Sequence, residues 1–166
     1  MIRIFILGFM GSGKTHWSKI WAEKYKLDCY DLDDLIVETE GLNINDIFHQ
    51  KGETYFRAAE ATALRTFSFQ KNFILSCGGG TPCFLDNMDW MKSHGITIYL
   101  KATPATIAAR LINGNAMRPL VRDLEPNQMI EYAEQKIIER EAFYLRSSLI
   151  LTEDQIDTES LSVLSL

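Results

Sequence analysis

The stretch from Gly8 to Thr15 constrains this chain more than any other part of its sequence. It reads Gly-Phe-Met-Gly-Ser-Gly-Lys-Thr, follows the apolar run Ile2–Leu7 and leads into the helical pattern Lys14–Tyr25. In a loop of this form, consecutive backbone N–H groups point into a hollow that a phosphate group can fill. The strand, loop and helix together predict a P-loop that binds a nucleoside triphosphate, and we expect ATP.

Individual residues of the loop have separate tasks in this predicted nucleotide site. Lys14 places a compact positive charge on the β- and γ-phosphates, and Thr15 offers a hydroxyl to Mg²⁺, the cofactor we expect beside ATP. The following helix directs its N-terminal dipole at the phosphates. The loop residues that we predict to bind ATP are Gly11, Ser12, Gly13, Lys14 and Thr15.

Short apolar runs alternate with longer amphipathic segments along the chain. The predicted strands are Ile2–Leu7, Asp28–Tyr30, Phe73–Cys77, Ile96–Lys101 and Leu149–Thr152. None of them shows the alternation of a half-exposed strand, which is typical of parallel strands buried on both faces. The predicted helices are Lys14–Tyr25, Glu53–Phe69, Leu85–Ser93, Pro104–Ile112, Pro126–Arg146 and a short one after Asp154. The pattern predicts a three-layer α/β/α fold with a five-stranded parallel sheet.

The length and composition fit one domain over residues 1–166. With 46% apolar residues in 166, the chain can bury a core without disulfides or metals. Asn, Gly and Pro interrupt the helical pattern between Asn113 and Pro119, so we expect a mobile loop there, at about residues 112–124. The three cysteines, Cys29, Cys77 and Cys83, match no common zinc spacing, and we expect buried structural thiols.

Charge and hydropathy exclude some classes of partner. The net charge is -5, from 17 Lys+Arg against 22 Asp+Glu, and an acidic molecule repels nucleic acids. No apolar stretch approaches the roughly 20 residues of a membrane span. We therefore expect a cytoplasmic monomer with neither a nucleic-acid nor a membrane partner.

Two carboxylates follow the second predicted strand, where parallel sheets place their ligands. Asp31 and Asp33 are two residues apart, so in an extended segment they point the same way. One would then reach the Mg²⁺ shell and the other a substrate hydroxyl. In the alternative interpretation, Asp33 or Asp34 only caps a helix that starts at Leu35.

A triple glycine and three arginines complete the set of candidate residues. The glycines Gly78–Gly80 follow the third predicted strand and allow a ligand or another backbone to come close, although a flexible turn also uses such residues. Arg57 lies three residues before Glu60, the spacing of a helix-surface ion pair. Taken alone, Arg57, Arg118 and Arg140 are each typical of solvated surface charges.

Together these residues resemble the shikimate kinase family of P-loop small-molecule kinases, over nearly the whole chain. The motifs that carry the resemblance occur in the family's order, as Asp31–Asp33, Gly52–Arg57, Gly78–Gly80, Arg118–Leu120 and the pair Arg140 and Tyr144. The resemblance implies transfer of the γ-phosphoryl group of ATP to the 3-hydroxyl of shikimate, which gives shikimate 3-phosphate and ADP. This step belongs to aromatic amino-acid biosynthesis.

The resemblance also implies roles for particular residues. Asp31 supports Mg²⁺ through water, together with Thr15. Asp33 binds the substrate hydroxyls, within a substrate-binding helical region at about residues 33–61. The substrate carboxylate is gripped by Arg57 and Arg140, helped by Gly79 and Gly80, and Glu60 orients an arginine.

Two further arginines belong to the nucleotide side in the family. Arg110 is the candidate that packs on the adenine, and Arg118 closes over the phosphates with the lid. The catalytic residues implied are Lys14, Asp33 and Arg118. This sequence departs from the family after Arg140, where Glu141-Ala142-Phe143 replaces an Asn-Pro-Leu type of segment and predicts an unbroken helix.

Other functions are consistent with part of this pattern. A gluconate kinase or another small-molecule kinase shares the P-loop and the architecture but differs in its carboxylate-binding arginines. A kinase with a nucleotide as acceptor is a further variant. From a different class, a nucleotide-binding regulatory module would keep the P-loop without catalysing transfer.

Overall fold

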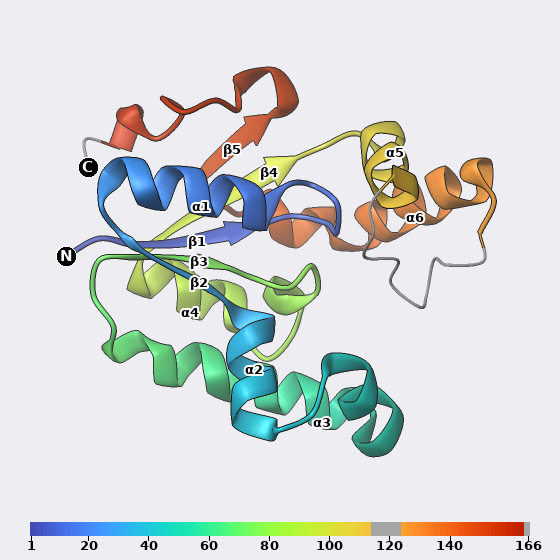
Figure 1. The fold of residues 1–166 in the computed structure, drawn as a ribbon, viewed down its shortest axis with the longest axis horizontal. Helices are drawn as coiled ribbons and strands as arrows, with labels where there is room; N and C mark the ends of the chain where they lie inside the picture. Colours follow the sequence, from blue (N-terminus) through green and yellow to red (C-terminus); the bar gives the residue numbers. More distant parts are fainter. Residues whose placement is uncertain (114–123, 165–166) are drawn as a thin grey trace.

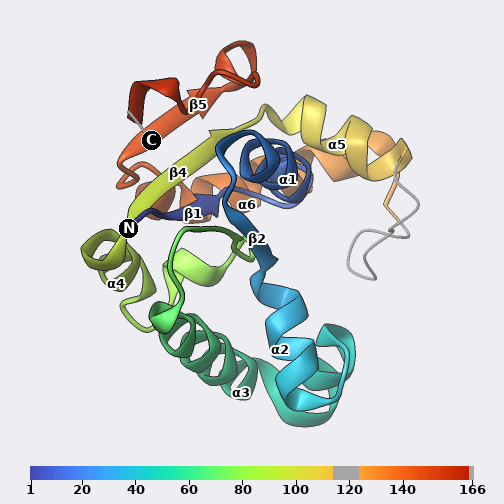
Figure 2. The same ribbon diagram turned by 60° about the vertical axis from the view of Figure 1, so that its left-hand side comes forward.

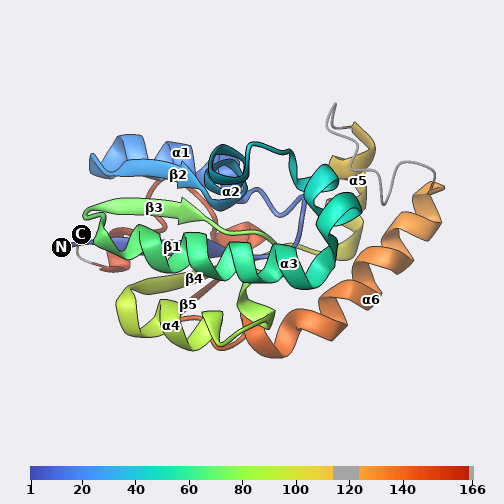
Figure 3. The same cartoon turned by 90° about the horizontal axis from the view of Figure 1, so that it is seen from below.

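The computed structural model describes residues 1–113 and 124–164, which form a parallel sheet between two layers of helices (Figures 1 and 3). The strands are β1 (Arg3–Leu7), β2 (Asp28–Asp31), β3 (Phe73–Ser76), β4 (Ile96–Lys101) and β5 (Leu149–Thr152). Their order is β2-β3-β1-β4-β5, and every pairing is parallel. The predicted α/β fold with five parallel strands is confirmed.

The helices of the described residues are α1 (Lys14–Tyr25), α2 (Leu32–Glu40), α3 (Ile44–Thr66), α4 (Asn87–His94), α5 (Pro104–Asn113) and α6 (Pro126–Tyr144). Short 3₁₀ turns are η1 (Phe67–Phe69), η2 (Thr81–Cys83), η3 (Glu153–Gln155) and η4 (Ser162–Leu164). Helices α5 and α6 begin at Pro104 and Pro126. Proline suits the first turn of a helix, because it lacks the N–H that would be unpaired there.

The segment between β2 and β3 contains more helix than the sequence analysis predicted. Helix α2 fills residues 32–40, and α3 starts at Ile44 rather than near Glu53. Gly52, with φ 84° and ψ 169°, breaks α3 into two helical parts with different directions. Such a φ suits glycine, so Gly52 separates the short first part from the long second part.

Alternate residues of β1 pack on opposite faces of the sheet. Ile4 and Ile6 join the core under α1, which includes Trp21. Phe5 and Leu7 join the core under α2, α3 and α4. Burial on both faces accounts for the continuous apolar residues from Ile4 to Leu7.

The edge strand β2 differs from this pattern. Its first two residues, Asp28 and Cys29, are exposed, so the expectation that Cys29 is a buried thiol was wrong. An edge strand has a neighbouring strand on one side only, which leaves these two residues more open to solvent. Cys77 is buried as expected, and Cys83 is partly buried.

The parallel arrangement brings the carboxyl ends of the strands to one edge of the sheet. The segments after β1, β2 and β3 therefore start next to one another, and Asp31 pairs with Ser76 in the register of β2 and β3. Figure 2 shows α2 and α3 on one side of these strand ends and α5 on the other. None of the helices in residues 1–113 and 124–164 has the length and apolar character that crossing a membrane requires.

The P-loop helix is anchored to the C-terminal segment through Trp21. The indole is fully buried, stacks on Trp17 with ring centroids 5.5 Å apart, and its Nε1 donates a hydrogen bond to the Asp157 carbonyl over 2.8 Å. We predict that Trp21→Ala lowers the free energy of unfolding by about 4 kcal/mol, because it empties a packed core site. Trp21→Phe keeps most of the ring and should cost less than half of that.

Urea denaturation of the two variants and the parent chain measures both costs. A loss below about 1 kcal/mol for Trp21→Ala would contradict the packing described above.

Candidate active site

The P-loop wraps around the N-terminus of α1. Gly13 is the N-cap residue with φ 95°, a left-handed conformation that glycine adopts without strain. The Lys14 ammonium lies over the loop, where Nζ donates hydrogen bonds to the carbonyls of Gly8 over 2.9 Å and Phe9 over 3.0 Å. These contacts hold a positive charge at the mouth of the loop.

A cavity of about 210 Å³ lies at the N-terminus of α1. In the described chain, no side chain caps this helix end and no acidic residue lies in its first turn. The Ser12 hydroxyl is buried and has no hydrogen-bond partner among the described residues. Free helix N–H groups, the helix dipole and a lysine are the features of an anion site, so the donor set fits phosphate.

Oxygen ligands for a cation lie beside this anion site. Thr15 Oγ1 donates to Asp31 Oδ2 over 3.0 Å and lies 3.4 Å from Ser76 Oγ. The Asp31 carboxylate and these two hydroxyls are few ligands, which is typical of a site where phosphates and water supply most of the oxygen ligands of Mg²⁺. Within residues 1–113 and 124–164, no group of three or more His, Cys, Asp or Glu residues forms a dedicated metal site.

Two arginines were predicted on the nucleotide side. Arg110, near the end of α5, donates from Nη1 to the Gly11 carbonyl over 3.0 Å, so its guanidinium lies against the P-loop. Arg118 and most of the predicted lid lie outside the described residues.

The backbone at Asp31 and Asp33 differs from the extended segment that we expected. The Asp31 side chain caps α2 by accepting a hydrogen bond from the Asp33 backbone N–H over 3.0 Å, and the helix begins at Leu32. The cap is therefore Asp31, not Asp33 or Asp34, and the helix starts three residues earlier than Leu35. Both carboxylates still line the cavity at the P-loop, because Asp33 lies in the first turn of α2.

A second cavity, of about 420 Å³, lies between α2, α3, α6 and the triple glycine. It combines apolar side chains with two guanidinium groups and two carboxyl groups. Its lining residues are Met10, Asp33, Ile44, Asn45, Phe48, His49, Phe56, Arg57, Glu60, Gly78, Gly79, Gly80 and Arg140.

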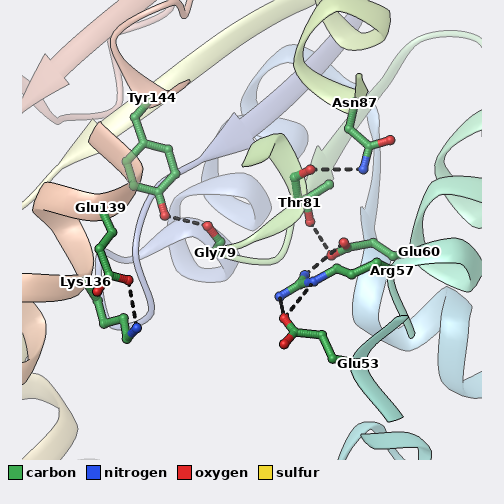
Figure 4. A network of polar contacts seen from close by, with 9 residues as sticks. All are labelled: Glu53, Arg57, Glu60, Gly79, Thr81, Asn87, Lys136, Glu139 and Tyr144. Carbon is green, nitrogen blue, oxygen red and sulfur yellow. Dashed lines mark hydrogen bonds and ion pairs between the residues drawn. The ribbon is translucent and has the colours of Figure 1, made fainter. Parts of the chain in front are cut away.

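The pair formed by Arg57 and Glu60 is buried, not a surface ion pair. The Glu60 side chain is 1% exposed, and its two oxygens accept from Arg57 Nη1 over 3.0 Å and from Thr81 Oγ1 over 2.6 Å (Figure 4). Burial raises the pKa of the Glu60 carboxyl, although the Thr81 hydrogen bond and the Arg57 charge act in the opposite direction. Glu60 fixes the guanidinium at the cavity wall.

The triple glycine provides the space that these side chains occupy. A Cβ atom on Gly80 would lie 2.6 Å from Arg57 Nη2, and one on Gly79 would lie 3.3 Å from Arg140 Nη1. Neither glycine has a positive φ, so a side chain at either position would displace an arginine guanidinium and would not strain the backbone. A plain flexible turn does not explain this constraint.

Arg140 reaches the second cavity although α6 continues unbroken to Tyr144. Its guanidinium carbon lies 5.6 Å from the centre of the Phe9 ring. Tyr144, one helical turn later, stacks on Tyr99 and donates a hydrogen bond to the Gly79 carbonyl (Figure 4). The helix thus holds both Arg140 and the glycine segment.

The two cavities adjoin. Four residues line both of them, namely Met10, Asp33, Gly78 and Gly79. A group bound at the P-loop therefore faces a molecule bound between Arg57 and Arg140, with Asp33 between them. Most of the described candidate residues line these two cavities, whereas Ser12 and Arg110 line neither and lie at the P-loop itself.

The sequence analysis did not single out several residues of the second cavity. Met10 lies within the P-loop motif, and the others lie in the short first part of α3 or just after it: Ile44, Asn45, Phe48, His49 and Phe56. All except Met10 lie within the region 33–61 that the resemblance assigned to substrate binding. Phe56 belongs to the Gly52–Arg57 motif, but no motif marks Ile44, Asn45, Phe48 or His49, because their common wall depends on how α3 bends at Gly52.

Glu60 and Glu53 provide a matched pair of tests, because both contact Arg57. Glu53 is 58% exposed, whereas Glu60 is 1% exposed. We predict that Glu60→Ala lowers the free energy of unfolding by about 3 kcal/mol, since it leaves buried donors on Thr81 and Arg57 without an acceptor. Glu53→Ala should cost less than about 1 kcal/mol.

Chemical denaturation compares the two variants directly. Equal losses for Glu53→Ala and Glu60→Ala would contradict the difference in burial.

Comparisons with known proteins agree over nearly the full chain. A family model described as shikimate kinase matches residues 10–165. The shikimate kinase of Azobacteroides pseudotrichonymphae genomovar. CFP2 is 42% identical over 152 residues, which cover 90% of this chain and 89% of that protein.

Solved structures agree with the fold. The 1.7 Å crystal structure of shikimate kinase from Bacteroides thetaiotaomicron has a TM-score of 0.94 and 32% identity, with 99% of each chain covered. The shikimate kinase from Acinetobacter baumannii in complex with shikimate has a TM-score of 0.84 and 26% identity, over 99% of this chain and 90% of that one. This chain belongs to the shikimate kinase family and is an ATP-dependent kinase.

Proposed function

We propose that this chain transfers the γ-phosphoryl group of ATP to the 3-hydroxyl of shikimate, giving shikimate 3-phosphate and ADP. The observation that carries the proposal is the shared wall of the two cavities, where Asp33 lines both. A phosphoryl group then passes directly from one ligand to the other. One domain over residues 1–166 performs the whole reaction.

The nucleotide side is assigned to the P-loop. The loop residues Gly11, Ser12, Gly13, Lys14 and Thr15 hold the phosphates, through backbone N–H groups, the Lys14 ammonium and the Ser12 hydroxyl. Thr15 and Asp31 would hold Mg²⁺, with Asp31 acting through water, and a bound ion would supply positive charge beside the phosphates. Arg110 lies against the loop and is assigned to the adenine.

The acceptor side is assigned to the second cavity. Shikimate is a ring with one carboxylate and three hydroxyls, so its site needs forked cationic donors and an acceptor for hydroxyl protons. Arg57 and Arg140 supply the donors, and Asp33 supplies the acceptor, next to Gly79 and Gly80.

Catalysis follows from position and charge. Lys14 stabilises charge on the transferred group. Asp33 orients the attacking hydroxyl and accepts its proton late. Early deprotonation is not needed, because a loose transition state has little bond formation to the nucleophile. Arg118, outside the described residues, is assigned to the phosphates in the closed lid of residues 112–124. Closure would exclude the water that otherwise hydrolyses ATP.

Release of ADP with and without shikimate tests the proposed function. We predict ADP formation that depends on shikimate and on Mg²⁺, with little release when gluconate or no acceptor is present. Equal ADP release in all of these mixtures would point to an ATPase or to another acceptor. No release in any mixture would favour a regulatory module.

Asp33→Asn keeps the size of the side chain but removes its charge. We predict that kcat/KM for shikimate falls by about 10- to 100-fold, because a charged hydrogen bond to the acceptor hydroxyl is lost. Asp34→Asn is the matched control, since Asp34 is exposed on the same first turn of α2. Steady-state kinetics of both variants measure the effect. Unchanged kcat and KM for Asp33→Asn would contradict the assignment of Asp33 to the active site.

A further inference from the structure

The segment after the triple glycine is clamped to α3 at two points. At one end, Thr81 Oγ1 donates to Glu60, and Asn87 Nδ2 donates to the Thr81 carbonyl over 2.9 Å (Figure 4). At the other end, Arg65 donates to Asn87 Oδ1 over 2.8 Å and to the Leu85 carbonyl over 2.7 Å. These bonds fix residues 81–87 against the helix that carries Arg57.

The clamp holds an unusual turn. Leu85 and Asp86 have φ values of 48° and 56°, which are uncommon for residues other than glycine. Such a conformation persists where surrounding bonds determine it, and here Arg65 supplies one of them. The turn places Phe84, which precedes these two residues, beside α3.

The Phe84 ring lies against the guanidinium of Arg57. The Arg57 Cζ atom is 4.2 Å from the centre of the Phe84 ring, compared with 5.1 Å for Phe56 and 6.0 Å for Phe48. The Arg57 side chain is only 11% exposed, whereas Phe84 is 36% exposed, so the contact is shielded from water on the side of the guanidinium. Desolvation strengthens the attraction between a cation and an aromatic ring.

We propose that Phe84 is a positioning residue for Arg57 and thereby sets the affinity for the substrate carboxylate. The proposal rests on the proposed function, in which Arg57 binds that carboxylate. Phe84 is absent from the described residues that line the second cavity, so it acts through Arg57.

The geometry explains why an aromatic ring suits this task. Arg57 donates from Nε and Nη2 to Glu53 and from Nη1 to Glu60, so carboxylates occupy the edge of the guanidinium. Glu53 is exposed, and a substrate carboxylate can replace it at that edge. An aromatic ring attracts the cation without supplying a carboxylate oxygen, so it does not replace the substrate as the acceptor of the N–H donors.

Substitutions at Phe84 distinguish the effect of the aromatic ring on KM from the effect of side-chain size. We predict that Phe84→Leu raises KM for shikimate about three- to tenfold, with kcat and KM for ATP within twofold of the parent enzyme. Phe84→Tyr keeps an aromatic face and should restore the parent KM. Phe69→Leu is the matched control, because Phe69 is 84% exposed and takes no part in the site. Phe84→Met removes the ring in a second way if the leucine variant does not fold.

A double-mutant cycle tests whether Phe84 acts through Arg57. In an Arg57→Ala background, Phe84→Leu should change kcat/KM for shikimate by less than twofold, since the guanidinium is already gone. The same loss with and without Arg57 would overturn the proposal, and so would a parent-like KM for folded Phe84→Leu. Failure of the proposed function looks different, because the parent enzyme itself would then form no shikimate-dependent ADP.

Discussion

The buried carboxylate of Glu60 holds together the cavity that we assign to the acceptor substrate. It accepts from Arg57 on the same helix and from Thr81 beyond the triple glycine. Burying a carboxylate is unfavourable unless its oxygens accept hydrogen bonds. If Arg57 or Thr81 moved away, Glu60 would be left buried and unsatisfied. The cavity wall, the glycines and the segment from residue 81 to residue 87 therefore keep one arrangement.

The nucleotide side is built from the backbone instead. The P-loop, the uncapped start of α1 and the ammonium of Lys14 form an anion site that depends on glycine conformations and helix geometry. Parallel strands bring this site and the acceptor cavity to the same sheet edge, where Asp33 lies at their boundary. The proposed transfer follows from this shared boundary.

Local patterns predicted the parts of the structure that depend on neighbours in the sequence. The P-loop, the strand positions and the start of α1 are of this kind, because periodicity and glycine spacing carry the information. Contacts between distant segments were not predictable. The burial of Glu60 depends on Thr81, 21 residues away, and the exposure of Cys29 depends on the position of β2 in the sheet. The Phe84 contact with Arg57 is another such case. The start of α2 is a local feature that was missed, because several neighbouring aspartates can cap a helix and the pattern does not indicate Asp31.

The central claim is that the γ-phosphoryl group of ATP bound in one cavity passes to the 3-hydroxyl of shikimate bound in the adjoining cavity. Phosphorus-31 NMR of the enzyme with ATP, Mg²⁺ and shikimate tests it most directly. The account predicts that the γ-phosphate signal of ATP is replaced by one phosphomonoester, in equal amount to ADP, whose phosphorus couples in a proton–phosphorus correlation to the proton on carbon 3 of the ring. Inorganic phosphate in place of that ester, or an ester on another hydroxyl, would contradict it.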